Sequence, residues 1–122
     1  MASSVTVTEE AHGKGFRKIT FDWTGHTDGV VTKVATSKVY TGKVEVLITD
    51  PDGVAAPTDN YDVTVTDDED YDILVGAGAN RDTANTETVL SASLGAVFES
   101  TIGPVVINSG TSKKGKIVLL IR

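Results

Sequence analysis

The chain has 122 residues, no Cys and a formal net charge of −6. That length fits one domain, so we expect a single domain over residues 1–122, with residues 1–4 as a flexible arm. The acidic balance argues against a nucleic-acid partner, because phosphate binding needs a basic surface. Without Cys the chain has no disulfides, thiolate metal ligands or thiol nucleophiles. The longest apolar run, 117–121, is too short for a membrane span. The N-terminus lacks a signal-peptide pattern, which predicts synthesis in the cytoplasm.

Period-two alternation of apolar and polar residues predicts β-strands over much of the chain. Val and Thr, the two commonest residues, are β-branched and favour strands over helices. Besides the run at Val5 and Val7, we expect shared faces for four groups: Ile19 with Phe21 and Trp23, Val44 with Val46 and Ile48, Tyr61 with Val63 and Val65, and Tyr71 with Ile73 and Val75. The final segment, 116–122, is apolar on both sides, as expected for a central strand covered on two faces.

Turn-forming residues separate these runs at roughly regular spacing. They occur at 13–15, 27–29, 50–53 and 109–115. The resulting seven to nine strands predict an all-β fold, namely an antiparallel β-sandwich of the Ig-like or jelly-roll-like kind. Residues 76–94 show no clear alternation, and we expect one long ordered loop or a short helix there.

The sharpest charge feature is an acidic cluster between two expected strands. Its candidate calcium ligands are Asp67, Asp68, Asp70 and Asp72, since hard cations bind carboxylate oxygens. The EF-hand template fails, because the twelfth position from Asp67 is a Gly. The simpler interpretation is a solvated hairpin turn.

The two histidines are the next candidates. With Glu10 or Asp28, His12 and His26 could form a metal site, although each lies in a polar turn outside any spaced motif. Surface turn residues are the simpler interpretation. No Gly-x-Ser-x-Gly motif supports a Ser-His-Asp triad.

Two further segments have an interaction hypothesis beside a structural one. Residues 76–81 faintly resemble a phosphate-binding loop but lack its Lys, so a flexible strand exit is the simpler interpretation. Next to them, Arg81 and Asp82 could pair with each other or meet a partner subunit. Lys113 and Lys114, with Lys116 beyond, could also contact a partner, or could protect a sheet edge from aggregation.

Three stretches in the middle of the chain carry a resemblance. They are GKVEVLITDPDG at Gly42–Gly53, APTDNYDVTVTD at Ala56–Asp67 and DILVGAGANRD at Asp72–Asp82. This pattern resembles a family of small structural proteins encoded among the head and neck genes of tailed bacteriophages. A weaker likeness continues from Leu94 to Leu119, and one departure is Tyr71, where a Gly is expected.

The resemblance implies a non-enzymatic virion protein without cofactor, small-molecule substrate or membrane partner. It implies a capsid decoration protein that binds the outside of the major capsid lattice, often as a homotrimer, and stabilises it. One alternative is a ring component of the tail, neck or baseplate. Another is a carbohydrate- or cell-surface-binding sandwich that uses Trp23 or Tyr40 and calcium at 67–72. We otherwise expect Trp23 to lie in the core.

Overall fold

The computed structural model describes residues 2–13 and 15–122, which form eight β-strands and one short 3₁₀ helix. The strands are β1 (Ser4–His12), β2 (Phe16–Thr24), β3 (Tyr40–Pro51), β4 (Asp62–Thr66), β5 (Glu87–Leu90), β6 (Ala96–Ser100), β7 (Gly103–Ile107) and β8 (Lys114–Ile121), with the helix η1 at Ser91–Ser93. No helix within these described ranges has the length and apolarity to cross a membrane.

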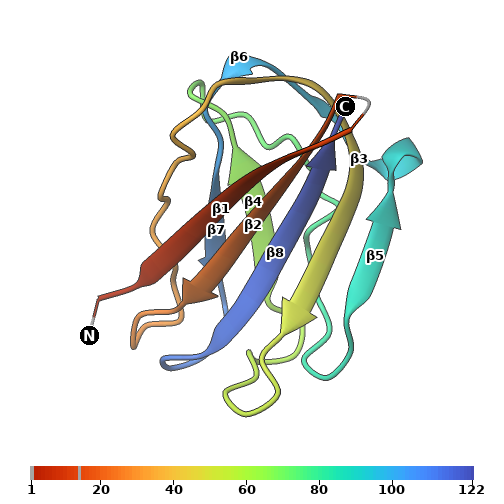
Figure 1. Ribbon diagram of the computed structural model, residues 1–122. Coiled ribbons are helices and arrows are strands. Elements are labelled where there is room, and N and C mark those ends of the chain that lie inside the picture. The colour runs from red at the N-terminus through yellow and green to blue at the C-terminus, as the bar shows by residue number, and fades with distance from the viewer. Residues whose placement is uncertain (1, 14) are drawn as a thin grey trace.

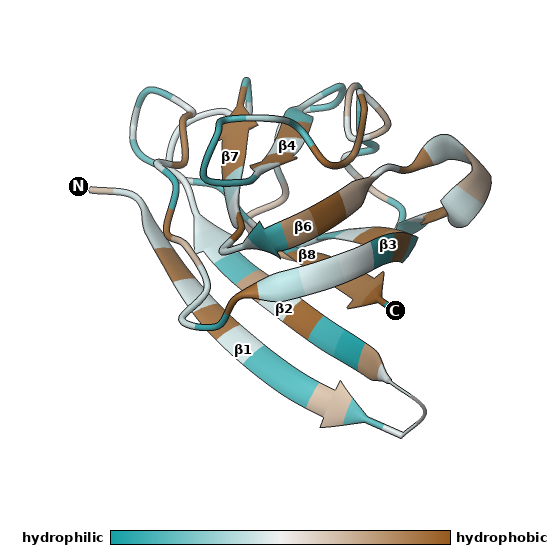
Figure 2. Cartoon of the chain, turned by 90° about the horizontal axis from the view of Figure 1, so that it is seen from above, coloured by the Kyte–Doolittle hydropathy of each residue, from teal (hydrophilic) through white to brown (hydrophobic). Residues whose placement is uncertain are grey.

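The larger layer is an antiparallel sheet in the order β1-β2-β8-β3-β5 (Figure 1). β8 lies between β2 and β3, so the last strand of the chain is central, as predicted. β6 pairs with the beginning of β3, at the end of the sheet where that strand starts. The β1–β2 hairpin extends beyond the rest of the molecule (Figure 2).

The smaller layer is built around the antiparallel pair β4–β7, which lies behind the large sheet in Figure 1. Residues 31–36 run beside β7, where Val31 bridges Val106 and the Thr36 N–H donates to the Ile102 carbonyl at 2.7 Å. On the other side of β4, Tyr61 bridges Arg81. The two layers confirm the predicted antiparallel β-sandwich.

Buried apolar side chains from both layers form one core. Ile19, Phe21 and Trp23 line the inner face of β2 and are fully buried, as the alternation predicted. Tyr61, Val63 and Val65 contribute from the smaller layer. The rings of Trp23 and Tyr61 meet with centroids 5.8 Å apart, so Trp23 belongs to the core, as expected.

A β-bulge in β3 makes one face assignment wrong. Val44 pairs with Ile121, but Val46 pairs with Leu120, so Glu45 is an extra residue in the strand. Beyond the bulge the facing pattern reverses, and Leu47 and Thr49 are fully buried while Val46 and Ile48 point outward. The predicted common face of Val44, Val46 and Ile48 therefore does not exist.

The expected strand at 71–75 is also wrong. Only an isolated bridge between Thr66 and Asp72 forms, and residues 73–78 are turns. The cause is Asp72, whose carboxylate accepts hydrogen bonds from the N–H groups of Val65, Leu74 and Gly76 and so stabilises turns over a ladder. Ile73 is buried, whereas Tyr71 and Val75 are half exposed.

Three other expectations change. Residues 76–94 hold turns and a short helix, η1, as one form of the expectation had it, but also the strand β5, which was not expected. The lysines near β8 do not protect a sheet edge, because β8 lies between β2 and β3. Of the expected flexible arm, residue 1 lies outside the described residues, while the Ser3 Oγ accepts a hydrogen bond from the Thr32 N–H and Ser4 begins β1.

The side chain of Glu9 joins β1 to the segment that leads into β3. One carboxylate oxygen accepts from the Ser37 N–H and hydroxyl at 3.1 and 2.7 Å. The other accepts from the Lys38 N–H and the Tyr40 hydroxyl at 3.2 and 2.7 Å. We call this arrangement the Glu9 latch, because it holds residues 37–40 against β1.

Two buried hydroxyls in the core lead to a stability prediction. Among the described residues, neither the Thr49 nor the Tyr61 hydroxyl makes a hydrogen bond of ordinary geometry. Burial raises the pKa of Tyr61 to about 12, and the neighbouring Thr49 hydroxyl opposes this rise only in part. Tyr61→Phe should leave the free energy of unfolding unchanged or raise it by up to about 1 kcal/mol, since it removes an unpaired polar group.

The matched control is Tyr40→Phe, which removes a hydroxyl that donates a hydrogen bond to Glu9. This variant should lower the free energy of unfolding by about 1 kcal/mol or more. Urea denaturation of both variants makes the comparison. A clear loss of stability in Tyr61→Phe would mean that its hydroxyl has a partner.

Candidate functional site: two exposed surfaces

The outer face of the large sheet is the first candidate surface. The register of the strands places its side chains in rows that cross neighbouring strands. One row holds Lys18, Leu120, Val46 and Leu90, and the next holds Thr20, Val118, Ile48 and Thr88. Nothing from the smaller layer covers this face, which is turned toward the viewer in Figure 1.

The middle of this face is apolar, which is unusual for the solvent side of an antiparallel sheet. Val46, Ile48, Val118 and Leu120 are half-buried among their neighbours, and Leu90 is 65% exposed. We call these five residues the apolar band. The last strand, β8, is apolar on both faces as expected, but the rest of the chain covers only its inner face.

A row of alternating charges borders the apolar band at one end. Lys116 on β8 pairs in register with Asp22 on β2 and with Asp50 on β3. Asp22 and Lys116 are exposed, and Asp50 accepts a hydrogen bond from the Thr86 hydroxyl at 2.9 Å. A shallow hollow at this end is lined by the side chains of Asp22, Asp50 and Lys116 together with Asp52 and Lys114.

The second candidate surface lies on β6, at the end of the sandwich where β3 begins. Tyr40 pairs with Ser100 but Gly42 pairs with Val97, so β6 contains an extra residue. Glu99 lies in this bulge at φ 45°, a backbone conformation that is strained for Glu. The bulge presents Phe98 to solvent with 77% of its surface exposed.

An exposed acidic turn lies beside the end of β6. The Asp68 N–H donates to the Ser100 Oγ at 2.9 Å, which holds the 67–71 turn beside the end of β6. Asp68, Glu69 and Asp70 are exposed there. We call Phe98, Glu99 and these three acidic residues the β6 patch. Alternation alone did not reveal it, because the bulge that exposes Phe98 leaves no sign in the sequence pattern.

The acidic cluster is the turn between β4 and the bridge at Asp72, and the carboxylates of Asp67 and Asp72 accept backbone hydrogen bonds within it. Asp67 Oδ1 accepts from the N–H groups of Glu69 and Tyr71 at 2.9 and 3.0 Å. Asp70, at φ 61°, supplies the left-handed position. In the described part of the chain, no three His or carboxylate side chains gather as a metal site, so the calcium interpretation has no geometric support.

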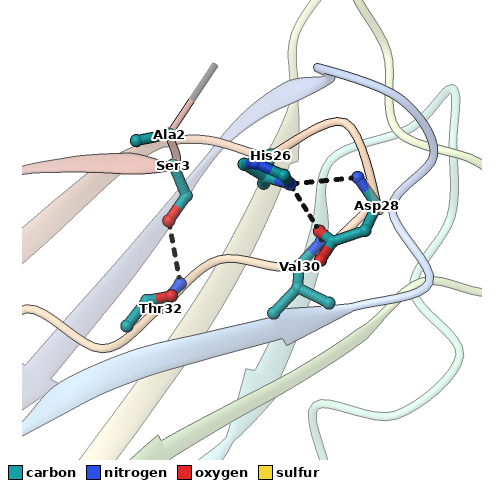
Figure 3. Close-up of a pocket in the computed structure, with 6 residues that line it drawn as sticks. All are labelled: Ala2, Ser3, His26, Asp28, Val30 and Thr32. Carbon is teal, nitrogen blue, oxygen red and sulfur yellow. Dashed lines mark hydrogen bonds and ion pairs between the residues drawn. The ribbon is translucent and has the colours of Figure 1, made fainter.

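The two histidines lie at opposite ends of β2 and cannot share a metal. His26 Nδ1 is 3.2 Å from Asp28 Oδ1 beside a shallow pocket that also contains Ser3 (Figure 3). The Ser3 Oγ is bonded to the Thr32 N–H, and no hydrogen bond joins it to His26. Asp28 also accepts from the Val30 N–H, as in a surface turn.

The predicted interface residues occupy two places. The Arg81 guanidinium is largely buried and pairs with Glu87 at 3.7 Å, so it is engaged within the chain. Asp82 caps its own turn, and the Ala84 N–H that it binds lowers its pKa. Lys114 is exposed at the charged end of the outer face, and Lys113 lies in the turn that precedes it.

The proposed sugar-stacking aromatics are not at the surface. Trp23 is fully buried and Tyr40 is 6% exposed, so neither ring can stack on a carbohydrate. The glycine loop at 76–81 does not cradle an anion, because Gly78 is buried against β4 and its carbonyl accepts the Val63 N–H at 2.8 Å.

The chain was also compared with protein-family models, curated proteins and solved structures, and no match was found in any of the three.

Proposed function

We propose that this chain is a non-enzymatic structural protein of a tailed bacteriophage virion, where it decorates the outside of the capsid and stabilises the shell. The observation that carries the proposal is the β6 patch, in which a strained bulge exposes the Phe98 ring to solvent and an exposed acidic turn is hydrogen-bonded to the end of the same strand. Exposed aromatic anchors with a polar rim are typical of protein-binding surfaces.

The chemistry of the patch defines the partner surface. Phe98 needs an apolar pocket on the partner, and the carboxylates of the acidic turn need basic residues near that pocket. We propose that the major capsid protein provides both. A net charge of −6 suits the exterior of a shell better than its DNA-facing interior.

A stabilising role follows from linkage. A protein that binds the assembled lattice better than free subunits shifts the equilibrium toward the shell, even when each contact is modest. The stiffness of the module supports this role, because the carboxylates of Asp67 and Asp72 fix the turns next to the patch.

The test is uptake by shells from the encoding phage that lack this protein, measured by co-sedimentation, with shell melting followed by calorimetry. We expect the wild-type chain to bind and raise the melting temperature. Phe98→Ser should weaken binding by about tenfold or more. The control Val54→Ser changes a residue that is 99% exposed in a distant loop and should bind normally.

Copies per virion separate the head from the tail. Hundreds of copies support decoration of the lattice, whereas about six or twelve would place the chain in a neck, tail or baseplate ring. Shells that neither take up the protein nor gain heat resistance would refute the proposal.

A further inference from the structure

The apolar band needs a cover that the chain itself does not supply. Isolated apolar residues on a surface are ordinary, but here five lie side by side on the strands β3, β8 and β5. From the geometry of the rows, we infer that a second copy of this chain covers the outer face, so that two large sheets pack face to face about a two-fold axis.

The charges determine where that axis lies. Consider an axis that runs parallel to the strands and lies between β8 and β3. Rotation about it places β8 of one copy opposite β3 of the other, and each row of one copy then faces the same row of the other copy. Lys116 then faces Asp50 of the second copy, and Asp50 faces its Lys116, so two equivalent ion pairs form.

The apolar rows match about the same axis. Leu120 faces Val46 of the second copy, and Val118 faces its Ile48. Leu90 faces the side chain of Lys18, whose methylene stem can lie along it. All members of the apolar band are thereby covered in one arrangement.

Other two-fold axes are less favourable. An axis directly over β8 would place Lys116 opposite Lys116 of the second copy, which is repulsive. An axis perpendicular to the strands, through the row of Val118 and Ile48, would place Leu120 opposite Lys116 and Val46 opposite Asp50. That arrangement would bury charges against apolar side chains.

The size of the face indicates how tightly two copies bind. The four strands that face each other in this arrangement, β2, β8, β3 and β5, are spaced by about 4.8 Å, and with about 3.3 Å per residue over eight residues they make a flat area of about 500 Å². Standard interfaces bury about 800 Å² per partner, so we expect a weak pair that forms at micromolar or higher concentrations.

A charge reversal tests the pair by sedimentation equilibrium of the free chain over micromolar to millimolar concentrations. We expect a monomer–dimer equilibrium for the wild type and at least about tenfold weaker association for Lys116→Glu, which places like charges opposite each other. The double variant Lys116→Glu with Asp50→Lys restores the ion pairs and should dimerise again. Lys113→Glu makes the same change in charge within the preceding turn and should dimerise normally.

Circular dichroism melting of each variant separates loss of association from loss of folding. The inference fails if the wild-type chain stays monomeric, forms the trimer implied by the phage resemblance, or dimerises equally well with Lys116→Glu. It also fails if the double variant folds but stays monomeric. None of these results bears on capsid uptake through Phe98, so the two proposals stand or fall separately.

Discussion

Replacing Gly78 with Ala is expected to lower the free energy of unfolding by about 3 kcal/mol or more. A Cβ at this position would lie within 2.1 Å of the Val63 carbonyl oxygen and 3.0 Å of a Leu74 methyl carbon. The same backbone segment is tied to β4 by the bond from the Val63 N–H to the Gly78 carbonyl. The loop cannot move away without breaking that bond.

Gly53→Ala is the matched control for this prediction. Gly53 has no atom within 4 Å of the added Cβ and no positive φ, so its substitution should change stability by less than about 1 kcal/mol. Urea denaturation compares the two variants. Equal stability would show that the backbone at Gly78 has room for a side chain.

Replacing Glu9 with Gln is expected to lower the free energy of unfolding by about 1–2 kcal/mol at neutral pH. An amide keeps one acceptor oxygen where the carboxylate uses two, so part of the Glu9 latch is lost. Residues 37–40 and β1 are then held together less firmly, because these hydrogen bonds link β1 to the segment that leads into β3.

The same variant tests the pH dependence of stability. Burial alone raises the pKa of Glu9, but hydrogen bonds from Tyr40, Ser37 and Lys38 outweigh it and lower the pKa below the ordinary value of 4.5. A carboxyl with a lowered folded pKa stabilises the fold above the unfolded pKa, and this stabilisation is lost as the pH falls through the folded value. The difference between wild type and Glu9→Gln should therefore shrink below about pH 4.5.

Glu10→Gln is the control for both parts of the Glu9 prediction. Glu10 is exposed, and its carboxylate lies 3.9 Å from the His12 ring, so its substitution should change stability by less than about 0.5 kcal/mol. Urea denaturation at several pH values measures all three proteins. If Glu10→Gln reduced the pH dependence of the free energy of unfolding as much as Glu9→Gln does, the Glu9 latch would not be the source of that pH dependence.

The strands that were predicted correctly are those with unbroken alternation. β2 and β4 alternate regularly, so their buried residues could be identified from the pattern alone. The errors arise where a single residue changes the geometry. Glu45 shifts the facing of β3 through a bulge, and the Asp72 carboxylate turns an apparent strand into a series of turns.

The candidate surfaces could be predicted only in part. The apolar outer residues of β8 were evident in the sequence, yet whether the chain covers them depends on strand order, which alternation does not encode. For the same reason edge protection was one interpretation of the lysines at 113–116, although β8 lies in the middle of the sheet. The exposure of Phe98 depends on a bulge that the residue pattern does not indicate.

The positions of β1 and β8 on either side of β2 should make the molecule resistant to tension applied between its chain ends. Both are antiparallel to β2, with nine residue pairs on one side and eight on the other, and the chain ends leave at opposite ends of the sheet (Figure 1). Tension applied between the ends would slide these strands lengthwise and load every pair at once, whereas peeling would open the pairs one by one. The rupture force should therefore be high along this direction, a quantity that single-molecule stretching measures and that reflects the unfolding rate.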